Sequence, residues 1–324
     1  RIMGKLQKAI GYYKDVKKKR KYFPNSVLNW QLAGKFLGQV PHLIGEKTAR
    51  YFYEKRHKVT VDFLVNNFHE FINQYDFFEA NTENSKIIWT LWWQGYENAP
   101  EIVKYCLYNM KIQAQKKGFE FFCLDQQTFK EFVDFPDYLE HKINQGNISI
   151  ANISDIIRVS LLAKYGGTWI DSTVFIQESF DWTVFTESYF TLKTGEITDY
   201  SPNIAKNRWK SFLLSGNSSL FAFTRDFFFE YFKKYDFVVD YLLIDYIFEL
   251  AFQRNSNIRN QMLDLEVTNP NLFWLEKHFD DTFEESLWKE ISKETKIFKT
   301  TYKLSERTKE NKNNFYTALI NKKL

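Results

Sequence analysis

The sequence predicts an α/β protein in which a mixed sheet is flanked by helices, with a helical appendage at the N-terminus. Three observations favour this fold class. Residues 1–80 carry only helix-compatible patterns, residues 86–124 form a strand–helix–strand pattern, and residues 152–170 form a buried helix followed by another strand. Strand–helix–strand units build parallel sheets with helices on both faces.

The N-terminal region begins with a helix-compatible segment over residues 3–21, which ends in five consecutive basic residues before Pro24. One face of this segment is apolar and the rest is cationic. It is either an anchor on an anionic lipid surface or a solvated helix docked on the core. A second helical pattern covers residues 48–75, and the polar residues 79–85 form the junction. We therefore expect two domains, a helical region over residues 1–80 and an α/β domain over residues 81–324.

The α/β domain opens with a strand at residues 86–92, a helix at residues 99–117 and a strand at residues 119–124. Ligands of open α/β sheets lie beyond the carboxyl ends of the strands. Trp92, Gln94 and Gly95 follow the first strand, and Asp125 follows the second. These four residues therefore occupy candidate ligand positions.

The buried helix carries Asp155 and Arg158, which lie three residues apart and hence side by side. They form either an internal salt bridge or a pair that faces a polar ligand in a cleft. We favour the ligand, because charged residues are rarely fully buried without a partner.

Two glycines, Gly166 and Gly167, end this helix, and a strand at residues 168–170 then delivers Asp171 to its carboxyl end. One glycine suits a left-handed helix cap, and the other allows close passage of the backbone. Asp171 is equally consistent with a ligand of a divalent cation that bridges diphosphate oxygens and with a turn or helix cap.

Composition restricts the function classes. The 44 Lys and Arg residues nearly balance the 40 Asp and Glu residues, so there is no global footprint of a nucleic-acid-binding protein. The two cysteines, Cys106 and Cys123, lie among apolar residues and fit a reducing, cytoplasmic setting. No apolar run reaches the roughly 20 residues needed to span a bilayer. The aromatic content of 19% mainly indicates a Phe-packed interior.

The second half of the chain predicts helices at residues 220–235, 238–252, 271–279 and 315–320. Residues 215–217 interrupt this pattern, and Asn217 there lies either in a plain turn or at a donor or acceptor contact. Asp240 and Asp245 flank the start of an apolar helix. They either cap this helix, or one of them is an acid on the acceptor side of the site.

The segment Ser154-Asp155-x-x-Arg158, with Tyr165-Gly166-Gly167-x-Trp169-x-Asp171-x-Thr173 after it, resembles the donor site of capsular polysaccharide synthesis glycosyltransferases. These enzymes are similar to glycosyltransferases with a DXD-containing sugar-binding region. The Trp-rich first strand resembles the opening strand of the same group. The resemblance implies a GT-A type, Rossmann-like fold, a nucleotide-diphosphate-sugar donor, transfer with retention, and Mn²⁺ or Mg²⁺.

The resemblance also implies roles for individual residues. Trp92 is placed against the base, Asp155 and Arg158 at the donor-sugar hydroxyls, and Asp171 at the metal. Thr173, a weak neutral ligand, stands where the commoner pattern has a second Asp. Tyr302-Lys303-Leu304-Ser305 resembles a basic segment that closes over the diphosphate, although a plain surface position suits Lys303 equally well. The expected donor-binding set is Trp92, Gln94, Gly95, Asp125, Ser154, Gly167, Thr173, Asn217 and Lys303, with Asp171 and Thr173 at the metal.

The expected function is that of a retaining glycosyltransferase in capsular or surface polysaccharide biosynthesis. It would transfer a hexose from UDP-Gal or UDP-Glc to a lipid-linked oligosaccharide. Its expected location is the cytoplasm, peripheral to the inner face of a bacterial cell membrane. Two rival functions are a glycoside hydrolase, which needs two carboxylates flanking the scissile bond, and a non-catalytic carbohydrate-binding protein.

Overall fold

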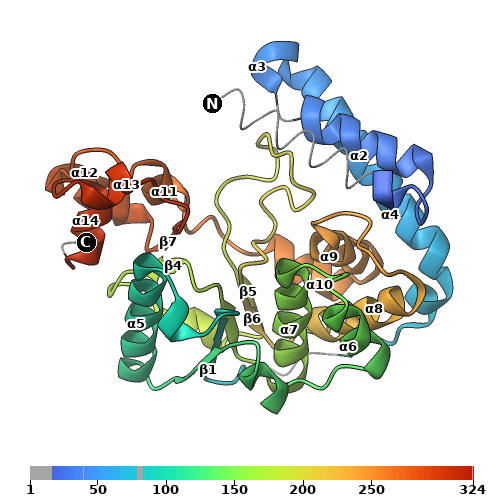
Figure 1. Ribbon diagram of the computed structural model, residues 1–324, viewed down its shortest axis with the longest axis horizontal. Coiled ribbons are helices and arrows are strands. Elements are labelled where there is room, and N and C mark those ends of the chain that lie inside the picture. The colour runs from blue at the N-terminus through green and yellow to red at the C-terminus, as the bar shows by residue number, and fades with distance from the viewer. Residues whose placement is uncertain (1–16, 39, 79–82, 323) are drawn as a thin grey trace.

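The computed structural model describes residues 17–38, 40–78, 83–322 and 324. Within them a five-stranded mixed sheet is flanked by helices, and further helices precede it along the chain (Figure 1). The predicted α/β class with an N-terminal helical region is therefore confirmed. The division between residues 80 and 81 stays a prediction.

The sheet has the strand order β2-β1-β3-β6-β5. Strands β2, β1 and β3 are parallel, whereas β6 is antiparallel to both β3 and β5. The carboxyl ends of β1 and β3 therefore lie at the same edge as the start of β6. The five strands are β1 (Ile87–Leu91), β2 (Glu120–Leu124), β3 (Thr168–Ile170), β5 (Tyr189–Thr191) and β6 (Leu213–Gly216).

Alternating side chains of the strands enter two hydrophobic cores, one on each face of the sheet. On one face, Trp89 and Trp169 pack with α7 (Ile150–Tyr165), α8 (Ser219–Lys234) and α9 (Leu243–Arg254). On the other face, Ile88 and Ile170 pack with α5 (Glu101–Lys116), which crosses from β1 to β2. The predicted strand–helix–strand unit is thus confirmed, and β1 and β2 pair in parallel.

The buried helix α7 begins after Ser149, whose hydroxyl accepts a hydrogen bond from the backbone N–H of Asn152. It ends at Gly166 (φ +66°), as predicted. Gly167 also has a positive φ, and a Cβ atom there would lie 2.6 Å from the carbonyl oxygen of Ile87. A glycine is therefore needed for β3 to approach β1.

The N-terminal helices are α2 (Asn25–Leu37), α3 (Pro41–Ile44) and α4 (Glu46–Gln74). The predicted helix at residues 48–75 is confirmed by α4. Phe63, Leu64 and Phe68 of α4 are buried in the same core as α8 and α9. Most of the predicted basic helix and of the junction lies outside the described residues, in 1–16 and 79–82. The helical turn that is described at residues 17–19 ends before Pro24, which precedes α2.

A second, two-stranded sheet joins β4 (Val174–Ile176) to β7 (Ile297–Lys299) in antiparallel pairing. It ties the chain just after Asp171 to the C-terminal helices, which lie beside it (Figure 1). The remaining elements are η1 (Tyr96–Asn98), η2 (Thr128–Glu131), α6 (Asp137–Asn144), η3 (Trp182–Thr186), α10 (Ser256–Leu263), α11 (Trp274–Lys277), α12 (Glu285–Glu294), α13 (Glu306–Glu310) and α14 (Phe315–Ile320).

Three predictions in the second half need correction. The helix expected from residue 238 begins only at Leu243, because Asp240 binds Arg56 and accepts a hydrogen bond from the Leu242 backbone. The helix expected at residues 271–279 is reduced to α11. The interruption at residues 215–217 begins inside a strand, since Ser215 pairs with Thr168 of β3. In each case tertiary contacts override the local pattern.

Among the described residues, no helix combines the length and the apolar character that crossing a membrane requires. The longest helix, α4, carries charged residues along its length.

Candidate active site

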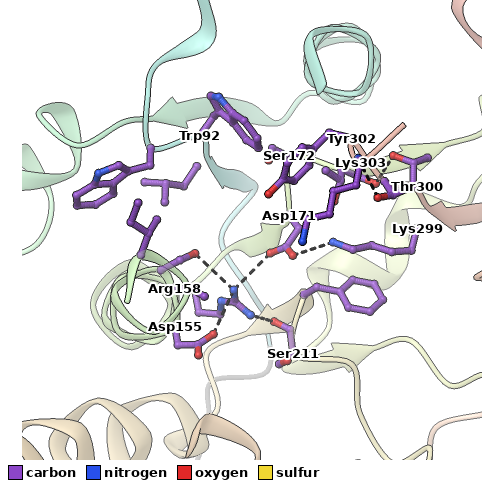
Figure 2. Close-up of a pocket in the computed structure, with 18 of the residues that line it drawn as sticks. Trp92, Asp155, Arg158, Asp171, Ser172, Ser211, Lys299, Thr300, Tyr302 and Lys303 are labelled. Carbon is purple, nitrogen blue, oxygen red and sulfur yellow. Dashed lines mark hydrogen bonds and ion pairs between the residues drawn. The ribbon is translucent and has the colours of Figure 1, made fainter. Parts of the chain in front are cut away.

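A cavity of about 780 Å³ lies beyond the carboxyl ends of β1 and β3. Its wall comes from the residues after β1, the first half of α7, the residues after β3, the start of α9 and the end of β7 (Figure 2). This is the edge at which ligands of α/β sheets bind. The predicted site residues that line it are Trp92, Gln94, Ser154, Asp155, Arg158, Asp171, Thr173 and Lys303.

Arg158 is the centre of the polar network in this cavity. Its Nη2 atom lies 3.3 Å from Asp155 Oδ1 and 3.4 Å from Asp171 Oδ1, and its Nη1 donates to the carbonyl oxygen of Ser211. The guanidinium also lies over the ring of Trp169, at 5.1 Å from its centroid. These contacts orient the guanidinium group, and Figure 2 shows the hydrogen bonds and ion pairs among them. The two expectations for the Asp155–Arg158 pair are compatible, because the internal salt bridge is itself part of the cavity wall.

Asp171 follows β3 and is bound through both carboxylate oxygens. Oδ1 accepts from Trp169 Nε1 at 3.0 Å, and Oδ2 accepts from Lys299 Nζ at 2.9 Å. Burial would raise the pKa of Asp171, but the charges of Lys299 and Arg158 outweigh burial and lower it. Asp171 is therefore ionised at neutral pH.

Asp155 has the opposite electrostatic character. Burial raises its pKa to about 7, although Arg158 opposes this shift, and the negative charges of Asp245 and Asp171 add to it. Asp245, in the first turn of α9, also lines the cavity and has a pKa raised by burial to about 6. Trp209 Nε1 donates to Asp245 Oδ1 at 2.7 Å. Two acids whose pKa values are raised toward neutrality thus lie on one side of the cavity.

The structure adds Lys299, which the sequence did not assign to the site and which ends β7 and reaches Asp171. Tyr302, in the segment expected to close over the diphosphate, packs edge-to-face on Trp92 with ring centroids 5.3 Å apart. The sequence signal that could have indicated Lys299 as a site residue is its place at the end of a short apolar segment.

Asp245 was expected as a helix cap or an acceptor-side acid, and it lines the cavity. Asp240 binds Arg56 and accepts a hydrogen bond from the backbone N–H of Leu242, the residue before α9, and α9 has no side-chain cap.

Four predicted residues lie outside the cavity lining: Gly95, Asp125, Gly167 and Asn217. Asp125 Oδ1 accepts from the backbone N–H groups of Gln127 and Thr128, so its carboxylate closes a turn. Asn217 lies at the opposite edge of the sheet, where its amide donates to the carbonyl oxygen of Glu83. Gly167 serves the packing of β3, and Gly95 (φ +82°) serves the turn after β1. We do not carry these four into the proposed site.

The residues around Asp171 do not fit a divalent cation held by the protein. Both oxygens of Asp171 already accept hydrogen bonds from cationic side chains or indole, and Thr173 offers only neutral oxygens. The described residues contain no group of three or more His, Cys, Asp or Glu side chains placed to hold a metal ion. The expected Mn²⁺ or Mg²⁺ stays a prediction.

Residues 41–319 match the family described as "Capsular polysaccharide synthesis protein". No curated protein and no solved structure matches the chain.

Proposed function

Since the chain belongs to the capsular polysaccharide synthesis protein family, we propose that it is a retaining glycosyltransferase with a GT-A type, Rossmann-like fold. Its donor would be a nucleotide-diphosphate hexose, UDP-Gal or UDP-Glc. Its acceptor would be a lipid-linked oligosaccharide, which requires the enzyme to work at a membrane surface. We therefore propose a peripheral location at the cytoplasmic face of the cell membrane.

One observation carries this proposal, the division of the cavity into three chemically different walls. Trp92 offers an aromatic surface, which suits a base. Lys299 and Lys303 offer ammonium groups, which suit a diphosphate. Asp155 and Asp245, with Arg158 beside them, offer hydrogen bonds to sugar hydroxyls. A nucleotide sugar has these three parts in the same molecule.

The proposed reaction exchanges one bond at the anomeric carbon for another. The bond between that carbon and the diphosphate oxygen breaks, and its electron pair leaves with the nucleoside diphosphate. The acceptor oxygen forms the new bond from the same face, and its proton passes to an oxygen of the departing diphosphate. Asp155 and Arg158 orient the donor sugar, and Lys303 stabilises the diphosphate. Catalysis rests on positioning and charge stabilisation.

Thermal unfolding with a panel of nucleoside diphosphates and nucleotide sugars tests the proposal. A glycosyltransferase should gain thermal stability with one nucleoside diphosphate, because ligand that binds only the folded state stabilises it. The matching nucleotide sugar should then donate its sugar to a lipid-linked acceptor. Hydrolysis of a simple glycoside without any nucleotide effect would instead indicate a hydrolase, and sugar binding without either reaction would indicate a binding protein.

A further inference from the structure

We infer that Lys299 supplies the positive charge at the departing diphosphate, so that nucleotide binding and transfer do not depend on a divalent cation. The inference rests on the proposed function, because it assigns a residue to the leaving group of that reaction. Asp171, where the resemblance implies a metal ion, already contacts two cationic side chains.

The position of Lys299 is fixed by backbone pairing. Lys299 pairs with Val174 across the β4–β7 sheet, and the backbone N–H of Thr300 donates to the carbonyl oxygen of Thr173 at 2.8 Å. The lysine is thereby held opposite residues 171–173, the segment expected to carry the metal. Its side chain is only 18% exposed, and its Nζ atom lies 4.7 Å from the ring centroid of Phe212. The ammonium group is therefore held in a fixed place in the cavity wall.

The charged groups in contact with Asp171 leave little attraction for a second cation. Asp171 provides one negative charge, and it already faces the positive charges of Lys299 and Arg158. A divalent ion at Asp171 would lie close to both and would be repelled by both. Residues 172 and 173 are Ser and Thr, so they add no negative charge that could offset this repulsion.

The same arrangement suits an anion. An ammonium group has three N–H donors, and the described contacts of Lys299 use one of them, toward Asp171. The diphosphate gains a negative charge when its bond to the anomeric carbon breaks, and an ammonium group held at that place stabilises this charge. Asp171 then acts as a positioning residue, which orients the ammonium group of Lys299.

Isothermal titration with UDP and with inorganic pyrophosphate tests this inference, each in EDTA and in Mn²⁺. The variants are Lys299→Gln, which removes the charge, and Lys299→Arg, which keeps it. Lys296→Gln is the matched control, because Lys296 immediately precedes β7, lies outside the cavity lining and donates to the carbonyl oxygen of Ser292. Thermal unfolding of each variant shows whether the fold is retained.

We expect UDP to bind with the same affinity in EDTA and in Mn²⁺. Lys299→Gln should weaken both ligands by about 10–100-fold, the range of one charge-assisted hydrogen bond. Lys299→Arg should retain most of the affinity, and Lys296→Gln should retain all of it. Transfer by the unaltered enzyme should persist in EDTA.

Binding of UDP only in the presence of Mn²⁺, or an unchanged affinity of Lys299→Gln in EDTA, would overturn the inference and leave the proposed transferase standing. Failure of every nucleoside diphosphate and nucleotide sugar to bind, with and without Mn²⁺, would overturn both.

Discussion

Asp155 and Asp171 contact the same guanidinium group, yet their pKa values shift in opposite directions. Asp155 is buried and Asp171 is half-buried, and loss of contact with water by itself raises the pKa of an acid. Asp171 has two cations beside it and its pKa is lowered, whereas Asp155 has Arg158 on one side and the negatively charged Asp245 near it. The number of cationic partners therefore decides the charge of each residue.

The raised pKa of Asp155 predicts how stability depends on pH. Between about pH 4 and pH 7 the unfolded chain releases the Asp155 proton while the folded protein retains it. Rising pH then favours the unfolded state, by up to about 1.4 kcal/mol per pH unit. Asp155→Asn removes this contribution. The free energy of unfolding of the unaltered protein, minus that of Asp155→Asn, should fall between pH 4 and pH 7.

Urea unfolding at several pH values measures this difference. Asp245 titrates in both proteins, so its own contribution largely cancels, and the lowered pKa of Asp171 lies below the window. A difference that stays constant from pH 4 to pH 7 would show that Asp155 has an ordinary pKa.

Trp92 is predicted to stack on the base of the donor. Its ring lines the cavity and is backed by Tyr302. Trp92→Ala should weaken binding of the nucleoside diphosphate by about 1–3 kcal/mol, as measured by titration calorimetry. Tyr96→Ala, which truncates an exposed aromatic residue outside the cavity lining, should leave the affinity unchanged. If Trp92→Ala folds normally and binds as tightly as the unaltered protein, Trp92 is a packing residue.

At the scale of the elements, α4 and the segment before α9 are joined by a buried ion pair. Arg56 Nη2 lies 2.6 Å from Asp240 Oδ2, and both side chains are less than one-tenth exposed. Arg56→Ala should lower the free energy of unfolding by about 3–5 kcal/mol, because it leaves the Asp240 charge buried without its partner. Chemical denaturation measures this loss.

The same helix provides the control. Lys58 and Asp62 form an exposed pair at 2.8 Å, and Lys58→Ala should cost about 0.5 kcal/mol or less. If Arg56→Ala lowered the free energy of unfolding as little as Lys58→Ala does, the N-terminal helices would contribute little to the stability of the rest of the protein.

The elements predicted from sequence are those whose pattern is local. The helices α4, α5 and α7 carry their own period and end signals, and the three-residue strand β3 directly follows the glycines that end α7. All four were predicted within two residues of their bounds. Strands β4 and β7 have only three residues each and pair across more than 100 positions of the chain. No periodicity can be recognised in three residues, so their partners decide their structure.

The residues of the candidate site also differ in whether their sequence pattern is local. Asp155, Arg158 and Asp171 lie within one short segment and were predicted together. Lys299 is 128 residues beyond Asp171, and only the β4–β7 pairing brings them into contact. Asn217 is the opposite case, since the sequence offered it for the site and the structure places it away from the cavity. A residue after a strand lies at the ligand edge only if that strand is parallel to β1 and β3, and β6 is antiparallel to β3.

At the scale of the whole molecule, the N-terminal helices and the C-terminal helices lie toward opposite sides of the sheet (Figure 1). The N-terminal side carries the basic residues at positions 17–21 together with exposed apolar side chains, among them Phe36 and Leu43. Basic residues before α2, together with exposed apolar side chains at the end of α2 and in α3, suit a surface of anionic lipid. We therefore expect this side to contact the membrane.

Replacement of Lys17, Lys18, Lys19, Arg20 and Lys21 by Gln should release the protein from anionic liposomes in a flotation assay. Each basic residue near such a surface contributes on the order of 1 kcal/mol. High salt should have the same effect, because the attraction is screened within roughly 8 Å at physiological ionic strength. Donor hydrolysis in solution should hardly change.

The C-terminal region offers a control of equal charge, in which Lys289, Lys293, Arg307, Lys309 and Lys312 are all exposed. Their replacement by Gln should leave liposome binding intact. Equal loss in both variants would mean that net charge, and not the N-terminal side, determines binding.

The pairing of β7 with β4 also has a consequence for biosynthesis. A ribosome completes the segment that carries Asp155, Arg158 and Asp171 well before it reaches Lys299. Until then the nascent chain holds Asp171 without one of its two cations and β4 without a partner strand. The cavity wall is therefore completed late in translation, and a chain that terminates before residue 297 would contain residues 154–173 and still lack both Lys299 and Lys303.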